Sequence, residues 1–304
     1  MRRKSRRTTL DGCWRLVETA DDARTVLFHD GQNVQLRVAP NLLCLNLVRQ
    51  AAACSGEILT RECGYLHDPA RHHKFGDEAR SLAPRPLRTR NGNLYPTHGR
   101  AVANCMDINR GDRFAHLVSM SSPSRGLQEY AIANYPEGHP KRAETFALGD
   151  VNGSLIQTAM GKTIYVVHDT NLPRPYDRIN KVQGTRGIFQ GYPDRVYIEG
   201  RSPGHRWEEA GTYYDEFEHP LWKALQEAAI GGGHGGMDFM EDYRLIKCLR
   251  EGLPPDMNVY DAAALSAVIE LSEISVANGS SPVEFPDFTR GKWRDWAPWP
   301  IVGA

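Results

Sequence analysis

The feature that most restricts the fold is a series of short β-prone runs joined by very short turns. They cover residues 116–120, 154–159, 163–168, 179–183, 188–190 and 195–199, and an earlier run at 56–66 also alternates as a strand does. The turns at 159–163 and 184–187 contain glycines, which supply the positive φ that tight hairpins need. Because parallel neighbours require crossovers of a dozen or more residues, this spacing predicts a meandering, mainly antiparallel sheet.

Helical periodicity appears on both sides of these runs. Apolar residues at helical spacing predict helices at 10–24, with Thr9 as N-cap, and at 45–53, 220–229, 237–249 and 259–277, the last starting from an Asn258 cap. We expect the three late helices to cover one face of the sheet, and the tail with Trp293, Trp296 and Trp299 to be an irregular strap packed by its aromatic rings. Residues 25–43 show no period, and 68–93 read as a long polar loop. The fold class is therefore α+β, an open-faced sheet with helices on one face.

Composition limits the partners and the compartment. Lys plus Arg equals Asp plus Glu at 37 each, which gives no reason to expect a nucleic acid or a membrane surface as partner. The basic N-terminal residues are followed by acidic ones and not by an apolar run, and no stretch reaches the roughly 18 apolar residues of a membrane-spanning helix. The six cysteines form no C-x-x-C pair, so we expect neither a zinc site nor disulfides. A cytoplasmic protein is predicted.

The segment Tyr95-Pro96-Thr97-His98-Gly99 concentrates reactive groups. Pro96 fixes its own φ and biases Tyr95 towards an extended conformation, so the phenol and the imidazole of His98 can be presented together on one short, rigid segment. The alternative is a loop whose Tyr and His merely satisfy hydrogen bonds.

The glycine string at 231–236 matches G-x-G-x-x-G but is not interpreted as a dinucleotide fingerprint. Such a fingerprint follows a strand, whereas residues 221–230 have helical character. We expect a closely packed or flexible loop that places His234 and Asp238 at the head of a helix, where backbone N–H groups favour an anionic partner.

Several long stretches resemble glycoside hydrolase family 109, the NAD-dependent α-N-acetylgalactosaminidases of the wider Gfo/Idh/MocA oxidoreductase group. They are NGNLYPTHG (91–99), MDINRGDRF (106–114), LVSMSSPSRGLQEYA (117–131), the run from GKTIYVV to YIEGRS (161–202), the run from GGHGGMDF to VYDAA (232–263) and LSEISVANGSSPVEFPDFTRGKW (271–293). The resemblance implies an open-faced sheet domain at 45–304. Residues 1–44 would be a basic tail and a remnant of a truncated NAD-binding Rossmann domain, because the glycine fingerprint has no counterpart.

The resemblance also implies a chemistry that does not use the usual carboxylate pair. A hydride passes from sugar C3 to NAD⁺, a base removes the C2 proton, the aglycone is eliminated, and water and hydride are returned. His98 would be the acid/base and Tyr176 the C2 base. Sugar contacts are expected from Tyr95, Tyr65, Arg174, His234 and Asp238, on an N-acetylgalactosamine-containing glycoside.

Alternatives remain for these residues and for the whole chain. Tyr176 could be a packed turn tyrosine, and Asp238 could only cap its helix. Pro84-Arg85-Pro86 stands where a Trp-Arg pair is expected, and Arg100 where a small or apolar residue is. The chain as a whole could instead be a catalytically silent module that binds sugar or forms homo-oligomers through the open sheet, or a sugar oxidoreductase.

Overall fold

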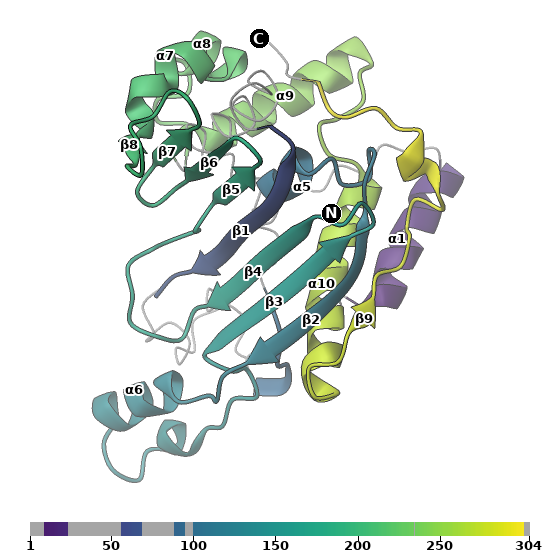
Figure 1. Ribbon diagram of the computed structural model, residues 1–304. Coiled ribbons are helices and arrows are strands. Elements are labelled where there is room, and N and C mark those ends of the chain that lie inside the picture. The colour runs from purple at the N-terminus through teal and green to yellow at the C-terminus, as the bar shows by residue number, and fades with distance from the viewer. Residues whose placement is uncertain (1–8, 24–55, 69–87, 95–99, 234, 301–304) are drawn as a thin grey trace.

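The computed structural model describes residues 9–23, 56–68, 88–94, 100–233 and 235–300 (Figure 1). These residues build a nine-stranded sheet in the order β8-β7-β6-β5-β1-β4-β3-β2-β9. The strands are β1 (Ile58–Leu66), β2 (Phe114–Ser121), β3 (Val151–Thr158), β4 (Thr163–Asp169), β5 (Lys181–Gly184), β6 (Gly187–Gln190), β7 (Arg195–Ile198), β8 (Glu208–Glu209) and β9 (Val283–Glu284). The helices are α1 (Leu10–Ala23), α5 (Arg100–Cys105), α6 (Gly126–Asn134), α7 (Tyr214–Phe217), α8 (Pro220–Leu225), α9 (Met237–Glu251) and α10 (Val259–Ala277), with short 3-10 turns η3 (Pro140–Ala143), η4 (Ala210–Tyr213) and η5 (Lys292–Arg294).

The expected open-faced, mainly antiparallel sheet is confirmed. Both glycine turns join antiparallel neighbours, β3 to β4 and β5 to β6, and Gly161 has the positive φ of +85° that its turn requires. Successive side chains of β3 alternate between the two faces of the sheet. Ile156 is buried on the helix side, and Leu155 is 52% exposed on the other face. The exception to the antiparallel pattern is the central pair, because β1 runs parallel to β4.

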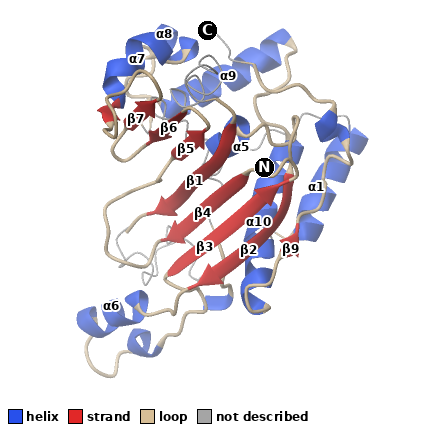
Figure 2. Cartoon of the chain, viewed as in Figure 1, coloured by secondary structure: helices blue, strands red, loops and turns tan. Residues whose placement is uncertain are grey.

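Helix α10 covers one face of the sheet, and α1 packs against α10 at the side of the sheet (Figure 2). Val17 of α1 and Val268 and Leu271 of α10 lie in the same buried core as Leu117 and Ile156 of the sheet. The expected Thr9 cap is present, since its Oγ accepts from Gly12 N at 3.0 Å.

The expectation that all three late helices cover the sheet is corrected. Met240 of α9 packs with Leu221 and Ala229 in a separate cluster beside the core. Helix α8 also ends at Leu225, earlier than expected, and turns follow it. A helix as short as α8 depends on tertiary packing, and Leu221 finds it against Met240 of α9 and not against the sheet.

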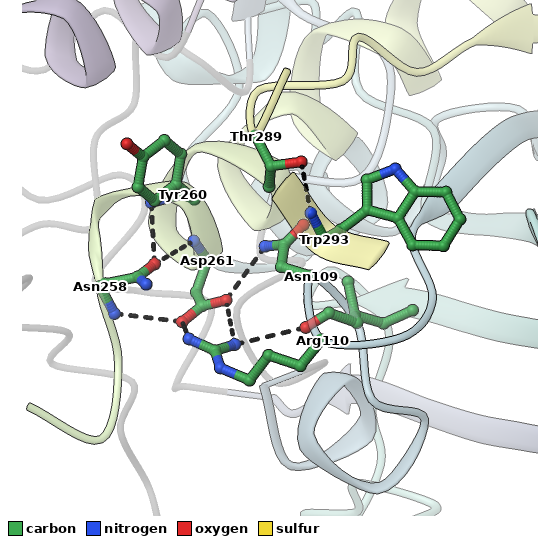
Figure 3. Close-up of polar contacts among 8 residues, drawn as sticks. Asn109, Arg110, Asn258, Tyr260, Asp261, Thr289 and Trp293 are labelled. Carbon is green, nitrogen blue, oxygen red and sulfur yellow. Dashed lines mark hydrogen bonds and ion pairs between the residues drawn. The ribbon is translucent and has the colours of Figure 1, made fainter. Parts of the chain in front are cut away.

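A buried polar cluster fixes the start of α10 (Figure 3). Asn258 caps the helix by accepting from Tyr260 N and Asp261 N, and Asp261 Oδ2 accepts from Asn258 N in return. Arg110 makes two 2.8 Å bonds to the Asp261 carboxylate, and Asn109 adds a third donor at 3.0 Å. We call Asn109, Arg110, Asn258 and Asp261 the Arg110–Asp261 cluster. The stretch 106–114 thus serves to lock the loop before β2 onto α10.

The C-terminal strap packs through its aromatic rings, as expected. Trp293 is buried, Trp296 meets Tyr260 edge-on at 5.1 Å, and the Arg110 guanidinium lies 3.8 Å from the Trp299 ring. Within the described ranges, no helix combines the length and apolarity needed to cross a membrane.

Candidate functional site

The parallel pair brings two strand ends to the same edge of the sheet. Tyr65 is in register with His168, and Leu66 with Asp169, so the residues that follow β1 and β4 leave the sheet side by side. The ladder continues past the strand, because His67 N donates to Asp169 O at 2.9 Å. The residues at the end of β4 are polar yet buried: His168, Asp169, Thr170 and Asn171. This edge is where side chains from distant parts of the chain meet.

The segment 174–178 returns along β1 and completes the edge. Leu66 and Asp177 exchange both backbone hydrogen bonds, at 2.9 and 3.1 Å, and Gly64 N donates to Arg178 O at 2.9 Å. A Cβ at Gly64 would lie only 2.8 Å from Val167 O, so only glycine allows this close approach of backbones. Tyr176 is thereby held next to the end of β1.

Four rings form an aromatic cluster: Tyr65, His67, Tyr176 and Tyr192. Tyr176 is central, with ring centroids 6.3 Å from Tyr65, 5.0 Å from His67 and 5.9 Å from Tyr192, all in edge-to-face geometry. Such contacts hold rings rigidly while leaving polar tips available to a ligand. The structure therefore brings together two of the predicted site tyrosines, and adds an imidazole.

Arg178 supplies the charge of this cluster. Its Nε donates to Tyr176 Oη, and its guanidinium carbon lies 5.2 Å from the centre of the same ring. Burial raises the pKa of Tyr65, the nearby Tyr176 raises it further, and Arg178 opposes the shift. Because the Tyr176 oxygen accepts from a cation, it can give up or take a proton while remaining hydrogen-bonded.

Arg174 points to two carboxylates. Its Nη1 lies 3.1 Å from Asp169 Oδ2 and its Nη2 lies 3.8 Å from Asp177 Oδ2. Asp169 also accepts from Leu172 N at 3.3 Å. These contacts tie the loop after β4 to the segment that carries Tyr176, which makes Arg174 a positioning residue; its contact with sugar stays a prediction.

Asp238 lies away from this edge, in the first turn of α9. Part of the preceding glycine string is closely packed by protein: a Cβ at Gly233 would meet Asp238 Oδ2 at 2.4 Å, and one at Gly232 would meet the Phe239 Cβ at 2.6 Å, whereas Gly231 and Gly235 face open space. Turns that continue α8, and not a strand, lead into the string. Because no strand precedes it, the string lacks the setting of a dinucleotide fingerprint, and we derive no hydride step from it. Among the described residues, no group of three or more His, Cys, Asp or Glu side chains could hold a metal ion.

Tyr95, His98 and His234 lie outside the described residues. The chain before Tyr95 is anchored: Asn93 N donates to Ser272 Oγ at 2.8 Å, and Asn93 Nδ2 donates to Val166 O of β4 at 3.4 Å. Arg90 adds an ion pair to Glu273 of α10. The roles of the three undescribed residues remain predictions.

Sequence reasoning missed His67, Arg178 and Tyr192. Two of them carried a usable signal, because Tyr65 and His67, like Tyr176 and Arg178, are separated by two positions and so share one side of an extended segment. Tyr192 carried none, since it reaches the cluster from the turn after β6, where its backbone has a positive φ of 60°.

The fold is shared with solved dehydrogenases of low sequence identity. A levoglucosan dehydrogenase in complex with NADH and L-sorbose matches with a TM-score of 0.63 at 18% identity, over 93% of this chain and 72% of that one. The WlbA dehydrogenase from Bordetella pertussis, in complex with NADH and UDP-GlcNAcA, matches with a TM-score of 0.56 at 14% identity, over 92% of this chain and 70% of that one.

The chain belongs to glycosyl hydrolase family 109. Residues 39–295 match the family's C-terminal domain, "Glycosyl hydrolase 109, C-terminal domain". A family 109 protein of Solibacter usitatus is 48% identical over 95% of this chain, and one of Shewanella sp. W3-18-1 is 45% identical over 97%. The chain spans only 66% and 65% of the lengths of these two relatives.

Proposed function

We propose that the carboxyl edge of β1 and β4 is the sugar-binding and proton-transfer site of a family 109 glycosidase that acts on α-N-acetylgalactosaminides. The observation that carries the proposal is the Tyr176 phenol, held by Arg178 at the centre of the aromatic cluster. Phenols and imidazoles are the groups that an elimination at sugar C2 needs, and the cluster offers both.

The roles follow from the geometry and from the family resemblance. Tyr176 acts as the base at C2, because its oxygen keeps the Arg178 hydrogen bond in either protonation state. Tyr65 donates a hydrogen bond to sugar, since its raised pKa keeps the phenol protonated. His98 is the acid/base and Tyr95 a sugar contact by resemblance alone, as are His234 and Asp238. NAD⁺ is the cofactor that the resemblance implies, and its binding by this chain is part of the proposal.

The test is hydrolysis of 4-nitrophenyl α-N-acetylgalactosaminide by the purified chain, with and without added NAD⁺. We expect NAD⁺-dependent release of nitrophenol, and a Tyr176→Phe variant at least about 100-fold slower, the lower range for loss of a general acid or base. Tyr197→Phe on β7 is the matched control and should keep wild-type activity. Equal rates for both variants would remove Tyr176 from the mechanism.

A non-catalytic sugar-binding module is the second candidate. It is supported by the glycine string, which follows turns and not a strand and so lacks the setting of a dinucleotide fingerprint. In that case methyl α-N-acetylgalactosaminide binds in ligand-observed NMR but is not hydrolysed. A sugar oxidoreductase would instead produce NADH from N-acetylgalactosamine, seen as absorbance of the reduced nicotinamide.

Self-association through the open sheet face completes the proposal. Leu155 and Tyr165 are paired across β3 and β4, and are 52% and 40% exposed on the side away from α10. Adjacent exposed apolar residues of this kind favour association between copies. Light scattering coupled to gel filtration should give a mass above that of one chain, and a Leu155→Lys variant should reduce it.

A further inference from the structure

The turn at residues 179–180, directly after the segment that carries Tyr176, has an unfavourable backbone. Ile179 has a φ of 62° and Asn180 a φ of 43°, although neither is glycine. Asparagine tolerates this left-handed region, whereas a β-branched residue such as isoleucine is strained there, because its side chain crowds the backbone. Strain of this kind persists only where the surrounding structure holds it in place, and it concentrates at functional sites.

The turn connects two segments that supply rings to the aromatic cluster. Asn180 N donates to Arg178 O at 2.7 Å, and Arg178 in turn donates through its Nε to Tyr176 Oη. On the other side, Asn180 O accepts from Gly191 N at 3.1 Å, and the next residue is Tyr192. The conformation of the turn therefore decides where Arg178 stands relative to the Tyr176 phenol.

Arg61 of β1 reaches this turn from inside the protein. It is 1% exposed, and its Nη2 donates to Asn180 Oδ1 at 2.7 Å. Its neighbour two positions along β1, Cys63, lies in the hydrophobic core. Burying a guanidinium beside such a core is costly unless strong acceptors meet it. The Asn180 amide oxygen is one, and a bond from a charged donor is stronger than one between neutral groups.

Other contacts fix the two ends of the turn. Asp177 Oδ1 accepts from Ile179 N at 2.5 Å, and Lys181 forms an ion pair with Glu62 of β1. The centre of the turn is tied to β1 through the side chain of Asn180, which is buried at 5% exposure. Without the Arg61 bond, Ile179 could relax towards a negative φ, and Arg178 would move with it.

From these contacts we infer that Arg61 is a positioning residue, which holds the strained turn and so keeps Arg178 in place to donate to Tyr176. The inference rests on the proposed function, because only that proposal makes Tyr176 a base. Arg61 acts through Asn180 and the backbone, and we assign it no contact with sugar. A buried residue of the central strand would thus affect the rate of a reaction at the edge of the sheet.

The kinetic test uses Arg61→Met, which keeps the length of the side chain but removes its donors. With 4-nitrophenyl α-N-acetylgalactosaminide and NAD⁺, kcat per folded molecule should fall about 10-fold, as for loss of one hydrogen bond involving a charged group, while KM stays within about twofold. Arg110→Met is the matched control, because it removes another buried arginine that is remote from the turn in sequence and bonded to α10. Its kcat per folded molecule should not change.

The structural test does not depend on turnover. In protein labelled with ¹³Cζ-tyrosine, the Tyr176 signal is assigned from its loss in Tyr176→Phe. Arg61→Met should move this signal in the same direction as Arg178→Met does, and Arg110→Met should leave it in place. Adding Ile179→Gly to Arg61→Met should restore both the signal and kcat, because glycine adopts a positive φ without strain.

A second variant covers the case in which Arg61→Met does not fold. Asn180→Gly deletes the acceptor at a position where glycine suits the backbone, and it should move the Tyr176 signal in the same direction. An unmoved signal in Arg61→Met or in Asn180→Gly overturns the inference, as does an equal shift in Arg110→Met. Failure of Ile179→Gly to restore the signal overturns the strained turn as the link. Failure of the proposed function is seen separately, as no turnover by the wild type.

Discussion

Two arginine-centred clusters in this molecule use their charge in opposite ways. Asp261 accepts four hydrogen bonds, two from Arg110 and one each from Asn109 and the Asn258 backbone, so its carboxylate is fully occupied by protein. Arg178 instead donates to a phenol, a group that can exchange a proton. The comparison shows that a long family-like stretch such as 106–114 can serve the fold alone, while the proposed proton-transfer group lies in a shorter segment.

The largest effect should come from breaking the Arg110–Asp261 cluster. Asp261→Ala leaves a buried guanidinium without its carboxylate and removes half of the capping box, so we expect the free energy of unfolding to fall by about 3–5 kcal/mol. Urea denaturation followed by circular dichroism measures this. A loss below about 1 kcal/mol would mean that the cluster does not hold α10 in place.

Replacing Arg178 should affect activity more than stability. Arg178→Met removes the donor to Tyr176, and kcat/KM should fall about 10- to 100-fold, as expected for one hydrogen bond involving a charged group. Arg110→Met is the matched variant: it should unfold at lower urea concentration, yet the folded fraction should keep its kinetic constants. The comparison is contradicted if both variants lower kcat/KM, or if both lower only the urea concentration at which the protein unfolds.

The pH dependence of the rate distinguishes the proposed hydrogen-bond donor Tyr65 from the proposed base Tyr176. Burial raises the pKa of Tyr65 above its usual value of about 10, so less than about 1% is phenolate at pH 8. Tyr65→Phe should weaken sugar binding by about 1 kcal/mol, the worth of one hydrogen bond. The shape of the rate profile between pH 6 and 9 should not change. A shifted alkaline limb in this variant would assign the base role to Tyr65.

The smallest effect is expected at an exposed ion pair. Arg201 makes two contacts to Glu216, at 2.8 and 3.0 Å, yet both side chains are exposed. Arg201→Ala should leave the urea midpoint almost unchanged, because water screens the pair. The same urea titration provides the measurement, and a larger loss would indicate that the Arg201 guanidinium stacked over the Tyr213 ring contributes in addition to the ion pair.

Local signals were enough for much of the fold. Gly161 predicted the turn between β3 and β4, and Asn258 predicted the start of α10, because a turn or a cap depends on a few adjacent residues. The parallel partner of β1 could not be predicted in this way. Thr60 pairs with Thr163, about 100 residues further along, and no local pattern encodes that register.

The candidate site was predicted only in part, because its residues are brought together by pairings that no local pattern encodes. Tyr65 and Tyr176 were predicted, but their meeting depends on the parallel pair and on the backbone bonds between Leu66 and Asp177. Arg174 was expected to contact sugar, and the structure shows it bound to Asp169 and Asp177, carboxylates whose proximity follows only from the tertiary fold.

The position of β1 also sets an order of folding events. Strands β2 to β4 and β5 to β8 form two meanders of mostly local pairings, whereas β1 joins them by closing a loop of about 100 residues to β4. Non-local pairings of this kind form slowly, so we expect the meanders to form first and β1 to be inserted last. Pulsed hydrogen exchange during refolding should protect β3 amides before those of β1. The proposed sugar site would then be assembled only in the final step of folding.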